Sequence, residues 1–135
     1  MRFKASVNEA KQGDPLMDYV MTMLHARTQA HMLHWVVTGP GSFAKHTALN
    51  IFYDKVPSLL DGFVESFQGK YGLLHDFKPG FELPPEPIAF IREVVQFIEG
   101  VRRREGFPQD SFLQNQVDEM LALAYSTKNS LENYQ

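Results

Sequence analysis

The sequence SFAKHTALNIFYDKVPSLLDGFVESFQGKY, residues 42–71, sets the architecture of the whole chain. Its apolar residues recur at spacings of three and four, which predicts one long amphipathic helix. Ser42 is the expected N-terminal cap and Gly72 the expected stop. Pro57 should kink the helix, because proline cannot donate a backbone hydrogen bond. The predicted core stripe consists of Leu49, Phe52, Val56, Leu60, Phe63 and Phe67.

Three further helices are predicted around this one, at about residues 15–38, at 87–104, and from 110 or 111 almost to the C-terminus. Asp14-Pro15 is a typical helix start, and Gly39-Pro40-Gly41 is a typical stop and turn. No strand pattern competes with these segments. The expected fold class is therefore all-α, with residues 1–135 forming a single domain and residues 1–13 a loose N-terminal arm.

The connection between the second and third helices indicates the topology. Residues 73–86 contain four prolines or glycines and should be extended; 14 residues span at most ~46–50 Å. The preceding helix of 30 residues is ~45 Å long, so the connection can cross the entire bundle. One long crossover between helices two and three is typical of a ferritin-like four-helix bundle. On length alone, an up-down bundle stays open as an alternative.

Composition excludes several classes of protein. Hydrophobic residues make up 44% and charged residues 21% of the chain, with a formal net charge of -3, which is ordinary for a globular domain. There is no cysteine, so disulfides and thiolate metal sites are excluded. No secretory signal and no apolar run of ~20 residues is visible, so we expect a soluble, cytoplasmic protein without membrane contact.

A polar face lies beside the core stripe of the second helix and consists of His46, Asn50, Asp54, Asp61, Glu65 and Gln68. It can be read as a solvated surface or as a source of metal ligands, because imidazole and carboxylate together bind non-haem iron. His46 and Asp61 are 15 residues apart, or ~22 Å along one helix, and cannot share an ion within one chain. Two copies of the helix packed antiparallel about an axis near residue 54 or 55 would bring them together.

The first helix adds His31 and His34, which are three residues apart and can lie on one helix face. A histidine on an apolar helix is more often a satisfied core or interface residue than a ligand. His25 and His75 have no evident partners in the pattern and keep that simpler interpretation.

At this point the sequence resembles a known family. His34-Trp35, a Gly-Pro turn, a second histidine twelve residues after the first, and an Asp-x-x-x-Glu on the same second helix resemble the starvation-inducible DNA-binding (Dps) branch of the ferritins. The residues that carry the resemblance are His34, Trp35, Gly39, Pro40, Phe43, His46, Asp61 and Glu65. The resemblance covers about residues 24–72, and the later helices match only in number and length.

The resemblance implies an iron site at a dimer interface, with His34 and His46 from one subunit and Asp61 and Glu65 from the other as metal ligands. It implies a ferroxidase, in which Fe²⁺ is oxidised by peroxide or oxygen and stored, and homodimers that can assemble into a dodecamer. One departure concerns Asn50, where the family usually has a carboxylate. A neutral amide is a weaker ligand for iron, so the activity of the site is an open question.

The sequence is therefore compatible with two functions. The first is an iron-binding protein that acts as a ferroxidase, in iron storage or in peroxide detoxification. The second is a non-enzymatic ferritin-like scaffold or binding protein, with a decayed site or one that holds zinc. We do not expect DNA binding under either function, because the N-terminal arm carries only Arg2, Lys4 and Lys11 and the net charge is acidic.

Overall fold

The computed structural model of the protein describes residues 13–134. These residues form four α-helices, α2 (Pro15–Val36), α3 (Ser42–Tyr71), α4 (Pro87–Val101) and α5 (Ser111–Asn133), and within this part of the chain there is no strand. The predicted all-α four-helix bundle is thus confirmed. Apart from Gly13, the expected N-terminal arm at residues 1–13 lies outside the described residues.

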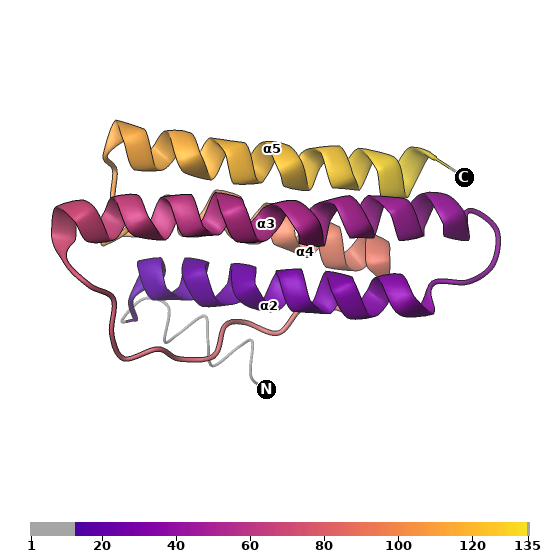
Figure 1. The fold of residues 1–135 in the computed structure, drawn as a ribbon, viewed down its shortest axis with the longest axis horizontal. Coiled ribbons are helices and arrows are strands. Elements are labelled where there is room, and N and C mark those ends of the chain that lie inside the picture. The colour runs from indigo at the N-terminus through magenta and orange to yellow at the C-terminus, as the bar shows by residue number, and fades with distance from the viewer. Residues whose placement is uncertain (1–12, 135) are drawn as a thin grey trace.

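The helices form a bundle in which each helix packs on two neighbours: α3 on α2 and α5, and α4 on α5 and α2 (Figure 1). Ion pairs identify which helix ends meet. Arg104 at the end of α4 pairs with Asp18 at the start of α2, and Arg92 near the start of α4 pairs with Glu132 near the end of α5. Helix α4 therefore runs antiparallel to both α2 and α5.

The core follows the stripe predicted on α3. Leu49, Phe52, Val56, Leu60 and Phe63 are buried, whereas Phe67 at the end of the stripe is only partly buried. Phe63 and Phe107 pack around the ring of Tyr19, with ring centroids 5.0 and 5.6 Å from it. Burial of these side chains is the main source of stability of the bundle, at roughly 1.5–3 kcal/mol for each large apolar side chain.

The helix ends follow local chemistry, with one correction. Asp14 caps α2 by accepting a hydrogen bond from the Leu16 amide at 2.9 Å, as the sequence predicts. The expected cap Ser42 is instead the first residue of α3, and Gly41 occupies the cap position without a side-chain bond. Gly41 has φ +77°, a left-handed conformation that glycine adopts without strain and serine does not. Helix α4 ends at Val101 and not near Arg104, because residues 102–106 turn.

The connection from Gly72 to Glu86 runs from the end of α3 along the outer side of α2 to the start of α4 (Figure 1). Thr22 accepts a hydrogen bond from the Phe81 amide at 2.9 Å, and the Gln29 amide donates to the carbonyls of Leu83 and Pro84 at 3.2 and 2.7 Å. Thr22 and Gln29 are buried. These two side chains of α2 therefore fix the path of an otherwise irregular segment.

A substitution of Gly80 tests the close contact between the connection and α2. A Cβ built on Gly80 would lie 2.5 Å from the backbone nitrogen of Thr22, so Gly80→Ala must push the connection away from α2. We expect a loss of about 1–3 kcal/mol in the free energy of unfolding, the usual cost of overpacking, measured by urea denaturation. Gly69→Ala is the matched control, because a Cβ there meets no atom within 4 Å and α3 should gain helix propensity. Equal stability of the two variants would contradict the tight contact.

Candidate metal site

The turn between α2 and α3 brings the two predicted histidine ligands together. Gly39 and Gly41 both have positive φ, at +83° and +77°, and the Ser42 amide donates to the Gly39 carbonyl at 3.0 Å. This tight reversal lays the start of α3 against the last turn of α2. His34 and His46 then face each other, with ring centroids 4.2 Å apart and their Nδ1 atoms 3.3 Å apart.

The two rings are close enough for one nitrogen of each to bind the same ion. Two nitrogen ligands that bind one ion at about 2.0–2.1 Å with a near-tetrahedral angle lie roughly 3.4 Å apart, comparable to the 4.2 Å between the ring centroids. His46 is exposed and His34 is partly exposed, so solvent ions reach both rings. Neutral imidazole is a common ligand for divalent transition metals.

The electrostatic environment favours the neutral form of His34. Partial burial, followed by the neighbouring His46 and His31 rings, lowers the pKa of His34 below its ordinary value, and Asp54 opposes that shift. A neutral ring offers a lone pair to an ion, whereas a protonated ring repels it. His34 is thus held in a form that can bind metal.

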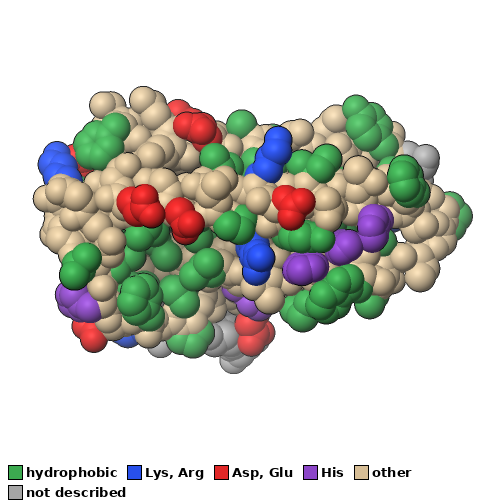
Figure 2. All heavy atoms as spheres, viewed as in Figure 1, with side chains coloured by type: hydrophobic (Ala, Val, Ile, Leu, Met, Phe, Trp, Pro, Cys, Tyr) green, Lys and Arg blue, Asp and Glu red, His purple; other side chains and the backbone are tan. Residues whose placement is uncertain are grey.

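Asp61 and Glu65 do not join the histidines. Both are exposed on α3, fifteen and nineteen positions after His46, and α3 is continuous through Pro57. Figure 2 shows histidine side chains at one end of the face formed by α2 and α3, and acidic side chains further along the same face. Within residues 13–134 of one chain, no three His, Cys, Asp or Glu side chains are grouped so that they could hold a metal ion.

Sequence reasoning missed a residue that the structure places at the centre of this site. The hydroxyl of Tyr53 lies 3.1 Å from His34 Nε2 and donates to Asn50 Oδ1 at 2.6 Å. The Asn50 amide in turn donates to Asp54 at 3.3 Å. Tyr53 is three residues after Asn50, a spacing that places the two side chains next to each other on a helix and could have revealed it.

An aromatic cluster surrounds the site. The His31 ring stacks on the Tyr53 ring with centroids 4.1 Å apart and an angle of 14°, and it lies 4.9 Å from Trp35. His31 therefore supports the ring of Tyr53 by stacking on it. Trp35 is 66% exposed, so it does not fill the core role that a tryptophan usually has.

Apo-protein stability should reveal the state of His34. Because folding lowers the pKa of His34, the unfolded chain binds the proton more readily. The resulting stability is present above the ordinary histidine pKa of about 6.5 and is lost as the pH falls below it. In urea denaturation at pH 8 and pH 5.5, His34→Gln should lose less stability between the two pH values than the wild type. His75→Gln, a change in the exposed connection, is the control and should behave as the wild type does; identical pH dependence of all three proteins would contradict the prediction.

The described residues contain no helix that is long and apolar enough to span a bilayer. Among curated proteins and among solved structures, no match to the chain was found. A family model matches residues 34–131, which is most of the chain and includes His34, His46, Asp61 and Glu65. The chain therefore belongs to a family of unknown function, DUF5856.

Proposed function

We propose that this protein is a ferritin-like iron-binding protein whose substrate, Fe²⁺, binds between two copies of the chain. His34 and His46 of one copy provide the nitrogen ligands, and Asp61 and Glu65 of the other provide the oxygen ligands. The observation that carries the proposal is the pairing of His34 with His46, whose Nδ1 atoms are 3.3 Å apart. This pair is half of the proposed ligand set, and the other half, Asp61 and Glu65, lies further along α3, out of its reach.

The donor chemistry supports iron as the ion. Two neutral imidazoles and two carboxylates supply a net charge of about -2, which balances Fe²⁺, and carboxylates favour the ferric product. Asp61 and Glu65 are one helical turn apart and exposed, and within the described residues neither has a hydrogen bond or an ion pair. Their oxygens therefore lose no partner on binding an ion. Each ferrous ion gives up one electron, so two ions with two protons reduce one hydrogen peroxide to two waters.

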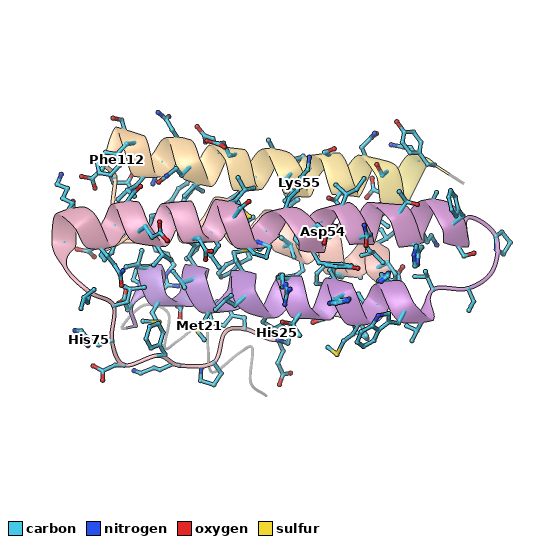
Figure 3. The ribbon with its side chains drawn as sticks, in the orientation of Figure 1. Met21, His25, Asp54, Lys55, His75 and Phe112 are labelled. Carbon is cyan, nitrogen blue, oxygen red and sulfur yellow. The ribbon has the colours of Figure 1, made fainter. Side chains whose placement is uncertain are left out.

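Pairing of two α3 helices follows from positions on the helix. If two copies pack antiparallel about an axis between Asp54 and Lys55, each of these residues lies opposite the other type in the second copy. Both side chains are exposed, and Figure 3 labels them near the middle of α3. The same axis places His46 opposite residue 63, between Asp61 and Glu65 of the second copy. Isologous pairing would thus form two ion pairs and two equal metal sites.

The surface around the histidines also suits an interface. Phe43 is 82% exposed and Val36 is 65% exposed, and Met32 and Ile51 are exposed as well. These residues lie on the last turns of α2 and the first turns of α3. Exposed apolar side chains clustered on one end of a small domain typically mark a contact surface. A second copy of the chain would cover them.

The path of the long connection supports the ferritin-like assignment. The segment from Gly72 to Glu86 starts at the end of α3 and passes along α2, where Gln29 binds the Leu83 and Pro84 carbonyls. It delivers α4 to the opposite end of the bundle, so α3 and α4 run in the same direction. One long crossover of this kind is typical of ferritin-like bundles.

A subunit-mixing experiment tests the shared site. His46→Ala and Glu65→Ala should each abolish binding of Fe²⁺, because each removes a ligand from both sites of the dimer. In a heterodimer of the two variants, one site carries both substitutions and the other carries neither. Random mixing makes about half of the dimers heterodimers, so equal amounts unfolded and refolded together should regain about a quarter of the wild-type capacity. Capacity is measured by equilibrium dialysis under anaerobic conditions.

The outcomes separate the alternatives. Refolding each variant alone is the control and should restore no binding. No recovery in the mixture, with wild-type protein that binds iron, would show that each site is formed by one chain. Wild-type protein that binds no iron, or that binds Zn²⁺ without accelerating Fe²⁺ oxidation by peroxide over buffer, would support the scaffold function with a decayed or zinc-occupied site.

A further inference from the structure

We propose that Tyr53 is a positioning residue which, together with Asn50 and Asp54, fixes the tautomer of His34 so that Nδ1 is its metal-binding nitrogen. The three residues form a continuous chain of hydrogen bonds that ends on the ring of His34. The purpose of this chain rests on the proposed function, but the direction of each hydrogen bond follows from chemistry alone.

The direction is set at Asp54. A carboxylate is ionised at neutral pH and only accepts hydrogen bonds, so the group of Asn50 that faces it at 3.3 Å must be the amide nitrogen. The amide oxygen of Asn50 then faces Tyr53. An amide oxygen also only accepts, so the Tyr53 hydroxyl donates its single proton to Asn50 Oδ1, at the short distance of 2.6 Å.

The same logic carries the direction on to His34. With its proton committed to Asn50, the Tyr53 oxygen can only accept from His34 Nε2, which lies 3.1 Å away. Neutral His34 therefore carries its proton on Nε2, and its Nδ1 is unprotonated. That unprotonated nitrogen faces Nδ1 of His46 at 3.3 Å and can accept a hydrogen bond from it.

The tautomer of His46 is the opposite one, with the proton on Nδ1. Its Nδ1 lies 3.0 Å from the backbone carbonyl oxygen of His34, which only accepts, so Nδ1 of His46 carries the proton. In the neutral ring, Nε2 is then unprotonated and, because the ring is exposed, open to solvent. The two rings thus offer an ion two different nitrogens, Nδ1 of His34 and Nε2 of His46.

Tyr53 also excludes the other nitrogen of His34. An ion on Nε2 would sit at about 2.0–2.1 Å from it, in the space that the Tyr53 oxygen occupies at 3.1 Å. Tyr53 cannot swing away freely, because its ring is partly buried and stacked on His31. Tyr53 therefore blocks Nε2 of His34, whereas Nδ1 faces the exposed ring of His46, which must turn for an ion to bind there.

This arrangement gives Asn50 a role other than that of a ligand. Only a side chain with a donor on one side and an acceptor on the other can link Asp54 to Tyr53, and an amide has both. A carboxylate at position 50 would meet Asp54 with like charge and could not donate to it. Asn50, which departs from the pattern of the Dps branch, thus links Asp54 to Tyr53 in the chain of hydrogen bonds that ends on His34.

Nitrogen-15 NMR of histidine-labelled protein without metal, at pH 8, tests the tautomer directly, with the His34 signals assigned from a His34→Asn spectrum. The wild type should show a proton on Nε2 of His34 and a bare Nδ1. Tyr53→Phe keeps the stacking on His31 but removes the hydroxyl, and should give a mixture of the two tautomers. Asn50→Ala should do the same, because without the amide oxygen Tyr53 can donate its proton to His34. A wild-type spectrum with the proton on Nδ1, or an unchanged tautomer in Tyr53→Phe, would overturn the proposal.

Metal binding gives the second measurement, with Zn²⁺ as the probe ion. Loss of an orienting hydrogen bond typically weakens metal affinity about ten- to a hundredfold, and we expect that loss in Tyr53→Phe. Tyr125→Phe is the matched control, because the Tyr125 hydroxyl bonds Glu99 away from this site, and it should bind as the wild type does. A fixed tautomer in a wild type that binds no metal would overturn the proposed function and leave the hydrogen-bond direction intact; equal affinities of wild type and Tyr53→Phe would overturn the positioning role.

Discussion

The rigidity of α3 is the constraint on which the arrangement of this protein depends. An α-helix rises 1.5 Å per residue, so the 30 residues of α3 hold any two side chains at a fixed separation. His46 and Asp61 are held ~22 Å apart whatever the rest of the bundle does. A single chain can therefore place only half of this ligand set at either end of the helix. Under the proposed function, completing the ligand set requires a second helix that runs in the opposite direction.

The same rigidity explains why the turn before α3 matters. Two glycines with positive φ reverse the chain within a few residues, so the last turn of α2 and the first turn of α3 lie side by side. The contact between His34 and His46 is a consequence of that tight reversal. The core stripe beside this polar face fixes the rotation of α3, because turning the helix would expose Phe52 and Phe63. Burial of one face thus determines which polar side chains the other face presents.

Much of the fold could be predicted from the sequence, because its signals are local. The spacing of apolar residues identifies the helices, and Asp14-Pro15 and Gly72 fix helix ends through backbone chemistry. The role of Ser42 was predicted wrongly, because a cap depends on the backbone conformation that the preceding glycine turn imposes. The seating of Gly80 against Thr22 could not be predicted, since contacts between residues almost sixty positions apart leave no local pattern.

The candidate ligands could be proposed from the sequence, whereas the hydrogen bonds around them could not be predicted. Imidazoles and carboxylates stand out in a sequence because few other side chains bind metal, whereas Tyr53 is indistinguishable there from a core aromatic. Its position became informative only through the distances to Asn50 and His34.

The role of Asn50 was equally difficult to predict, although the sequence had drawn attention to it. When the sequence is compared with the ligand pattern of the Dps branch, a neutral amide in place of a carboxylate suggests a loss of charge and of metal affinity. Placed between a carboxylate that only accepts and a hydroxyl that must donate, it is the side chain that satisfies both neighbours. Whether a substitution in a metal site is a decay therefore depends on the hydrogen bonds around it, and in this protein those bonds lead from Asp54 to the ring of His34.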